Sequence, residues 1–371
     1  MKKQVASLFL SAALLLSVCS VPAFAAQPDA AENAGASDII VLPAPSETPS
    51  DPSSSETTQA PSDETTTAPE TTPEATPETH ADGDAAQSDE TSSQITYVAL
   101  GDSICAGIGL VNTSDYIGKN LVGLDVADNF HGYPDGCYVG VVANSLGLDR
   151  QHAINLGLPA LMTSDLVYLL RDGAVPEMNQ LSGTQYNYPQ MRDYISKADV
   201  ISIQIGSNDA LIPCVVGLGE ATNWKSEYLA SVVLSGSLRD GAGSALMEGL
   251  KKMSLTKSET DATWKLLTSG MSKICEDAYP TASENLRTIV EEIRKLNPDA
   301  QIILLSYTNP VPLIPCWSKY FNRMNKYARQ LAEVYDLTFV SIPWTQTELD
   351  GHPTLSGHKY IANKLLKAID R

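Results

Sequence analysis

Short apolar segments alternate with segments of helical spacing along the chain beyond residue 93. The apolar segments are rich in β-branched residues, and they are predicted to form strands at 95–100, 153–156, 200–205, 302–306 and 338–341. Strands that alternate with helices are typical of a parallel sheet covered by helices on both faces. In such sheets ligands bind outside the carboxyl ends of the strands. We therefore expect an α/β domain whose functional residues directly follow its strands.

The predicted helices are unevenly distributed along this part of the chain. Helical spacing covers 138–146 before Gly147, a charged segment from 284 to 296, and an amphipathic C-terminal segment from 356 to 369. The stretch from about 211 to 280 is longer than a crossover between strands requires, and it contains further helical patterns at 228–238, 245–253 and 263–275. We interpret it as a helical insertion, which either roofs the functional site or packs on the flank of the sheet.

The first 93 residues have a different composition. Residues 1–25 combine a basic start, a short apolar run and Ala23-Phe24-Ala25, which predicts a secretory signal peptide and an extracellular protein. Lipidation at Cys19 is the second interpretation. Residues 26–93 are Thr, Ser, Pro, Ala and acidic residues with almost nothing to bury, so we expect a disordered linker that acts as a spacer.

Charge and cysteine content limit the possible ligands of the domain at 94–371. The whole-chain net charge of −19 divides into +2 for the signal peptide, −15 for the linker and −6 for the domain. A mildly acidic domain does not predict nucleic-acid binding. The domain has five cysteines whose spacing is not that of a zinc site, so no metal is expected, and their odd number leaves the disulfide pairing open: Cys105, Cys137, Cys214, Cys275 and Cys316.

Three polar motifs follow strands or lie in loops of this domain. Gly101-Asp102-Ser103 follows the first strand, where a tight turn presents a serine to the crevice. Gly206-Ser207-Asn208-Asp209 follows the third strand, where an asparagine amide can stabilise an oxyanion. His352 lies in a loop with proline and glycine just before the last helix. Each motif alone is also compatible with an ordinary turn or a solvated histidine.

Together, and in this order, the motifs resemble the SGNH hydrolase superfamily, specifically its GDSL-type esterases and lipases. The segments that carry the resemblance are YVALGDSICAG (97–107), IQIGSNDAL (203–211) and DGHPTLSGHKYIA (350–362), and it extends over 95–371 apart from the insertion. The resemblance implies a three-layer α/β/α sandwich with a mainly parallel, flavodoxin-like, five-stranded sheet. It also implies a serine esterase in which Ser103 is the nucleophile, His352 the general base and Asn208 an oxyanion-hole donor together with the Ser103 amide.

Two positions depart from the family pattern. In NLGLPALMTSDL (155–166), Ala160 occupies the position of an oxyanion-hole glycine; a backbone N–H suffices there if alanine can adopt the conformation, and Gly157 is the fallback. The family's aspartate lies three residues before its histidine, where this chain has Leu349. Asp350 lies two residues before His352, and we expect it to orient the imidazole unless a backbone carbonyl does so. Asp102 is expected to stabilise the turn.

The implied activity is hydrolysis of acyl esters without a cofactor. The expected substrates are lipids or small acyl esters, and any association with a membrane or cell surface would come through the substrate only. The long acidic linker also suits a polysaccharide O-acetylesterase acting on a polymer. The rival from another class is a non-catalytic surface-binding module of the same fold. A dinucleotide-binding domain is excluded because no Gly-x-Gly-x-x-Gly follows the first strand.

Overall fold

The computed structural model describes residues 94–108, 110, 133–178, 185–225, 253–307, 309, 315–343, 345–347 and 351–369. The predicted signal peptide at 1–25, the linker at 26–93 and Asp350 lie outside these residues. The helices expected at 228–238 and, apart from Met253, at 245–253 also lie outside them.

The described residues contain one parallel sheet of five strands. The strands are β1 (Tyr97–Gly101), β2 (Ala153–Gly157), β3 (Val200–Gln204), β4 (Gln301–Leu305) and β5 (Thr338–Val340). Their order is β2-β1-β3-β4-β5, and Gly101 at the end of β1 pairs with Gly157 and Gln204. The parallel α/β fold predicted from the sequence is therefore confirmed.

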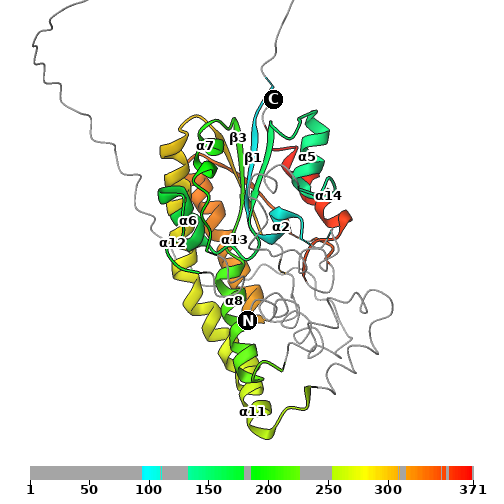
Figure 1. Ribbon diagram of the computed structural model, residues 1–371, viewed down its shortest axis with the longest axis vertical. Helices are drawn as coiled ribbons and strands as arrows, with labels where there is room; N and C mark the ends of the chain where they lie inside the picture. Colours follow the sequence, from blue (N-terminus) through cyan, green and yellow to red (C-terminus); the bar gives the residue numbers. More distant parts are fainter. Residues whose placement is uncertain are drawn as a thin grey trace, which may run out of the picture. The chain divides into compact units, whose positions relative to one another are not determined.

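Helices cover both faces of the sheet and form the outer layers of a sandwich (Figure 1). One face packs on α5 (Tyr138–Leu146) and α14 (Leu355–Leu365). The other face packs on α6 (Thr163–Asp172), α7 (Gln190–Ser196), α12 (Met271–Leu296) and α13 (Pro315–Val334). Successive side chains of β1 point to opposite faces of the sheet and so pack into two different cores. Val98 and Leu100 pack in the core beside α12. Tyr97 and Ala99 pack in the core beside α5.

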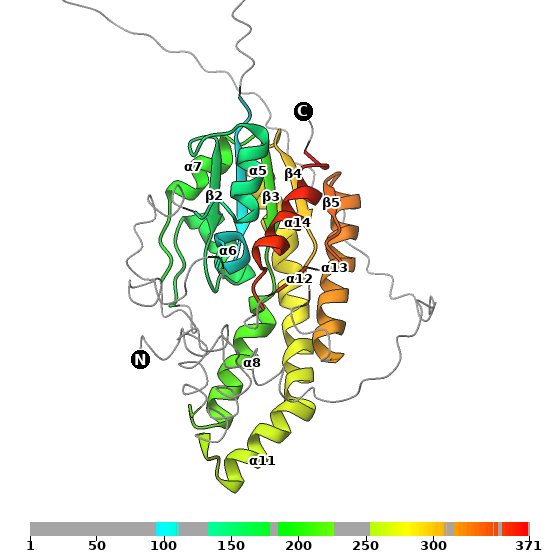
Figure 2. The same ribbon diagram turned by 90° about the vertical axis from the view of Figure 1, so that its right-hand side faces the viewer.

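Two long helices extend past the carboxyl ends of the strands. Both views show α8 (Asn208–Ala221) and the N-terminal half of α12 running side by side beyond the sheet (Figures 1 and 2). At their far end, α11 (Lys257–Lys265) continues through a π-helical segment, η1 (Leu266–Gly270), into α12. The sequence predicted separate helices at 263–275 and 284–296, but the structure has one helix from 271 to 296 with Pro280 inside it.

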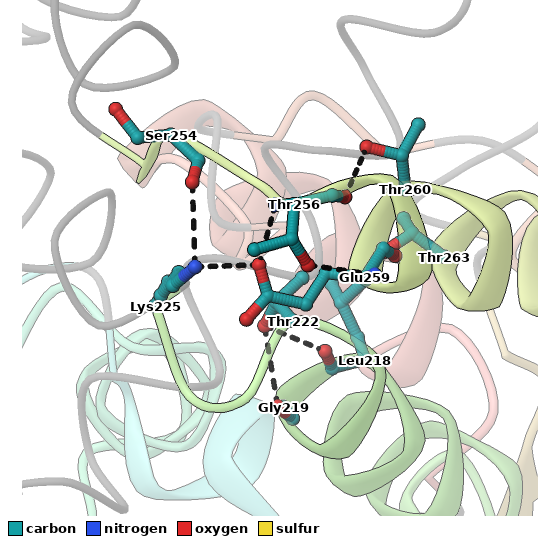
Figure 3. A network of polar contacts seen from close by, with 9 residues as sticks. All are labelled: Leu218, Gly219, Thr222, Lys225, Ser254, Thr256, Glu259, Thr260 and Thr263. Atoms are coloured by element: carbon teal, nitrogen blue, oxygen red, sulfur yellow. Dashed lines mark hydrogen bonds and ion pairs between the residues drawn. The ribbon is translucent and has the colours of Figure 1, made fainter.

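A network of polar contacts holds the far ends of α8 and α11 together (Figure 3). Lys225, just after α8, forms an ion pair of 2.5 Å with Glu259 in the first turn of α11 and donates to the carbonyl of Ser254 over 3.3 Å. Glu259 also accepts from the backbone N–H of Thr256, whose side chain caps α11 in return. These contacts connect the residue that follows α8 to the first turn of α11.

Among the described residues, no helix has both the length and the apolar composition required to cross a membrane.

Candidate active site

Ser103 lies at the carboxyl end of β1, on a turn that other residues hold tightly. It is the first residue of the short helix α2 (Ser103–Ala106), and Asp102 caps that helix by accepting from the N–H of Ile104 over 3.0 Å. Ser207, on the neighbouring strand end, donates to the second carboxylate oxygen of Asp102 over 2.6 Å. Burial raises the pKa of Asp102, and the bond from Ser207 opposes that shift. Asp102 therefore stabilises the turn, as the sequence predicted.

Gly101 makes this turn possible by its lack of a side chain. A Cβ atom at this position would lie 2.7 Å from the Gln204 carbonyl oxygen and 2.7 Å from the Cys105 Cβ atom. Since real Cβ atoms do not approach other atoms so closely, any larger residue would displace β3 or α2. The close approach explains the glycine two residues before Ser103.

His352 reaches Ser103 from the loop before α14. Its Nε2 atom lies 2.9 Å from the Ser103 Oγ atom, although the two residues are 249 positions apart in the chain. Both residues are buried, at 8% exposed each. The side chains that the sequence analysis predicted as nucleophile and base thus lie within hydrogen-bonding distance of each other.

The loop that carries His352 is tied to the preceding segment. Thr354 caps α14 through the N–H of Gly357 and donates its own N–H to the Gln346 carbonyl oxygen over 2.9 Å. A Cβ atom on Gly357 would lie 2.4 Å from that same carbonyl oxygen, so only glycine allows α14 to approach so closely. These contacts define where the imidazole lies relative to the end of β1.

Asn208 lies at the end of β3, as the first residue of α8. Gly206 turns the chain there with a φ of 123°, and its carbonyl oxygen accepts a 2.7 Å hydrogen bond from the Tyr320 hydroxyl. The Asn208 amide donates one N–H to the Leu161 carbonyl oxygen over 2.9 Å. A carboxamide has two such donors, and this hydrogen bond uses one of them.

The two candidates for the remaining backbone donor differ in their conformation and contacts. Ala160 has a φ of 65°, which is the left-handed conformation that normally favours glycine. Alanine therefore adopts a glycine-like backbone at the position where it departs from the family pattern. Gly157 already donates its N–H to the Asn155 side chain over 2.9 Å, and its Cα packs against the start of α2, where a Cβ atom would lie 2.5 Å from the Ala106 nitrogen. The choice of Ala160, with Gly157 as the fallback, stays a prediction.

Asp209 is a buried carboxylate that the sequence did not single out. Its two oxygens accept from the Thr163 hydroxyl over 2.5 Å and from the Thr163 N–H over 3.1 Å. Asn285 of α12 donates to the same hydroxyl over 3.0 Å. Burial raises the pKa of Asp209 to about 6 despite the bonds from Thr163. These contacts connect α8, which begins at Asn208, to the segment of Ala160.

Other polar residues do not take part in the contact between Ser103 and His352, or lie outside the described residues. Asp350 lies outside, so its role stays a prediction. His358 is buried in α14, where its Nδ1 atom accepts the Tyr138 N–H over 3.1 Å, and burial lowers its pKa to about 3. It therefore connects α14 to α5 as a neutral ring. His152 lies near the surface and contacts Asp149. Within the described part of the chain, no group of three or more His, Cys, Asp or Glu residues is arranged to hold a metal ion.

Comparison with solved structures finds several similar chains at low sequence identity. A lipase from a goat rumen metagenome is 17% identical with a TM-score of 0.45, and the match covers 74% of this chain and 97% of that one. An extracellular lipase from Streptomyces rimosus is 16% identical with a TM-score of 0.39, covering 74% and 100%. An acetylxylan esterase from Geobacillus stearothermophilus is 16% identical with a TM-score of 0.37, covering 75% and 94%.

Comparison with protein families gives the assignment. No curated protein matches the chain significantly. The model of the GDSL-like lipase/acylhydrolase family matches residues 99–360. That match spans more than half of the chain and includes Ser103, Asn208 and His352. The chain therefore belongs to the GDSL-like lipase/acylhydrolase family.

Proposed function

We propose that this protein is a serine esterase that hydrolyses acyl esters through a covalent acyl-enzyme. The observation that carries the proposal is the 2.9 Å contact between the His352 Nε2 atom and the Ser103 Oγ atom. A hydroxyl next to an imidazole at the open end of a parallel sheet is the arrangement that nucleophilic acyl transfer requires. A binding module that had lost catalysis would not need to keep this pair aligned and buried, so the contact also disfavours the non-catalytic alternative.

The first half of the reaction forms the acyl-enzyme. His352 accepts the proton of the Ser103 hydroxyl as the oxygen attacks the ester carbonyl. The negative charge moves onto the carbonyl oxygen, where the Ser103 N–H, the Ala160 N–H and the Asn208 amide stabilise it. The tetrahedral intermediate then expels the alcohol, which leaves with the proton from His352.

The second half regenerates the enzyme. Water gives a proton to His352 and attacks the acyl carbon, and the same donors stabilise the second oxyanion. Ser103 leaves as the hydroxyl after it recovers the proton. Asp350 is proposed to hold the imidazole and stabilise its protonated form, since a carboxylate next to the ring is the usual way to do so. None of these steps requires a cofactor.

Ester hydrolysis by the full chain, with Ser103→Ala measured in parallel, tests the proposal. We expect p-nitrophenyl acetate hydrolysis by the unchanged chain and a loss of roughly 10⁴-fold or more in kcat for Ser103→Ala, because removal of a triad member leaves only oxyanion-hole and binding effects. Ser145→Ala is the matched control, since this exposed serine on α5 only donates to the Val141 carbonyl oxygen. Equal rates for the chain and Ser103→Ala would eliminate the serine mechanism.

The acyl group is proposed to be a lipid acyl chain or a short acyl chain. A series of p-nitrophenyl esters of increasing chain length, with acetylated xylan beside it, separates this proposal from the alternative of a polysaccharide O-acetylesterase. Activity that is confined to acetyl groups on the polymer would favour that alternative. We also propose export through residues 1–25, which secretion of a full-length chain compared with one lacking these residues would test.

A further inference from the structure

Three cysteines from three helices meet beside the extended part of the fold. Cys214 lies in α8, Cys275 in α12 and Cys316 in the first turn of α13. The pKa of Cys275 responds to both other thiols, and that of Cys316 responds to Cys275, so the three side chains are neighbours. All three pack in the core on the α12 side of the sheet, where Cys214 and Cys275 are buried and Cys316 is partly exposed. Sequence spacing alone left the pairing of these cysteines open.

A surface pocket between α12 and α13 is lined by two of the three cysteines. Its wall includes Cys275 and Cys316 but not Cys214, which is fully buried. Lys319 and Arg323 line the same pocket, together with Glu276, which forms an ion pair with Lys319. A small oxidant can therefore reach the Cys316 thiol from solvent, and the Cys275 thiol lies on the wall of the same pocket. The positive charges of Lys319 and Arg323 favour an oxidant that is negatively charged.

We propose that Cys275 and Cys316 form a disulfide that cross-links α12 to α13, and that Cys214 remains a thiol. The oxidant is a low-molecular-weight disulfide of the glutathione type. The Cys316 thiolate attacks one sulfur of glutathione disulfide and releases one glutathione thiolate. The Cys275 thiolate then attacks the Cys316 sulfur of the mixed disulfide and releases the second. The two protein thiols lose their protons and two electrons, and the oxidant is reduced to two glutathione molecules.

The environment of the two thiols affects the rate of this exchange. The Cys214 thiol and burial raise the pKa of Cys275 to about 12, although the Cys316 thiol opposes that shift. The Cys275 thiol and burial raise the pKa of Cys316 well above its usual range. Since the thiolate is the reacting form, uncatalysed oxidation at neutral pH is slow. The oxidising compartment that the predicted export signal leads to favours the disulfide once it has formed.

The cross-link would stabilise the domain without touching the catalytic residues. It closes a loop of the 40 residues 276–315, which contains β4 and its connection to α13. Closing a loop of this size restricts the unfolded chain, and reduction is expected to lower Tm by roughly 5–10 °C. The cross-link also joins α12, which packs along α8, to the start of α13.

Peptide mapping of the oxidised full chain tests the pairing. The purified chain is reduced, incubated with glutathione disulfide at pH 8.5, alkylated and digested with trypsin without reduction. The Cys275 peptide spans 274–287, the Cys316 peptide 296–319 and the Cys214 peptide 198–225, so the pairs are distinguishable by mass. We expect 274–287 joined to 296–319 and an alkylated 198–225. A cross-link between 198–225 and 274–287, or alkylation of all three peptides, would overturn the proposal.

Two variants provide a second readout that does not depend on peptide recovery. Cys316→Ser should abolish the Tm difference between the oxidised and reduced protein. Cys137→Ser should keep that difference, because this cysteine lies in the other core and its Sγ atom caps α5, a role that a serine oxygen can take over. A Tm difference that survives in Cys316→Ser, or that is lost in Cys137→Ser, would contradict the assignment.

Discussion

Replacing Asp209 with asparagine removes a buried charge while keeping the size of the side chain. Burial raises the pKa of this carboxyl from 3.8 to about 6 in the folded protein. A carboxyl with a raised pKa binds its proton more tightly in the folded chain than in the unfolded chain. Its contribution to folding is therefore most favourable below about pH 4 and is lost as the pH rises through about 6.

The size of the effect follows from the shift. Two pKa units correspond to about 3 kcal/mol over the whole titration, of which about 2 kcal/mol falls between pH 4.5 and 7.5. The free energy of unfolding is measured by urea titration at both pH values for the unchanged chain and for Asp209→Asn. The difference between the two proteins, unchanged minus variant, should fall by about 2 kcal/mol from the lower to the higher pH, because only the unchanged chain carries the titrating group.

A control variant shows whether the sign has the proposed cause. Asp149 is exposed, and its hydrogen bond with His152 lowers its pKa. The difference for Asp149→Asn should therefore not fall between pH 4.5 and 7.5. A difference for Asp209→Asn that stays constant between pH 4.5 and 7.5 would refute the reasoning.

Asp209→Asn should also lower kcat by about 10–100-fold at pH 7.5, because Thr163 loses one of the two carboxylate oxygens that hold it and so position the segment of Ala160.

Three further substitutions test the proposed roles in the site. His352→Ala should lower kcat by roughly 10⁴-fold or more in ester hydrolysis assays, whereas His152→Ala, which alters a surface histidine, should leave it unchanged. Asn208→Ala should lower kcat by roughly 10²–10³-fold in the same assay, and a fall in urea stability without a fall in kcat would restrict it to a structural role. Ala160→Gly should keep kcat within about threefold and change the free energy of unfolding by less than about 1 kcal/mol. Glycine relieves the strain of the left-handed conformation, but it also removes a buried methyl group and makes the unfolded chain more flexible, so the effects on stability nearly cancel.

Three of the five strands were readily predictable because a glycine directly follows the apolar run: Gly101, Gly157 and Gly206. The predicted run 95–100 became Tyr97–Gly101 and 200–205 became Val200–Gln204, with differences of one or two residues. The helix at 138–146 was predicted with its observed bounds because Gly147 ends it with a φ of 68°. Local residue chemistry decides such boundaries, so the sequence contains them.

The long helices were less predictable because tertiary packing overrides local signals. Pro280 separates the patterns that suggested two helices, yet α12 continues through it while one face packs on α6, α8 and α13. Helix α8 was not predicted at its observed bounds either, and it contains Pro213. A proline that normally argues against a helix interior is tolerated when the neighbouring helices bury the apolar face.

The contacts that complete the site depend on residues far apart in the chain. Ser103 and His352 were predicted to meet because each lies in a recognisable motif. The bond from Thr163 to Asp209 joins residues 46 positions apart, and neither spacing nor composition indicates it. The one available signal was that Asp209 follows Asn208 directly in the same strand-end motif. The meeting of Cys275 and Cys316 likewise depends on how α12 packs against α13.

Covalent labelling with a fluorophosphonate tests most directly whether Ser103 is a nucleophile activated by His352. Such a reagent reacts with an activated serine and leaves a stable phosphonyl adduct. Mass spectrometry of the digested chain then identifies the residue that carries the adduct. The account predicts a single adduct on Ser103 in the unchanged chain and a much slower reaction in His352→Ala. An adduct on another residue, no adduct, or equal labelling rates in the two proteins would contradict it.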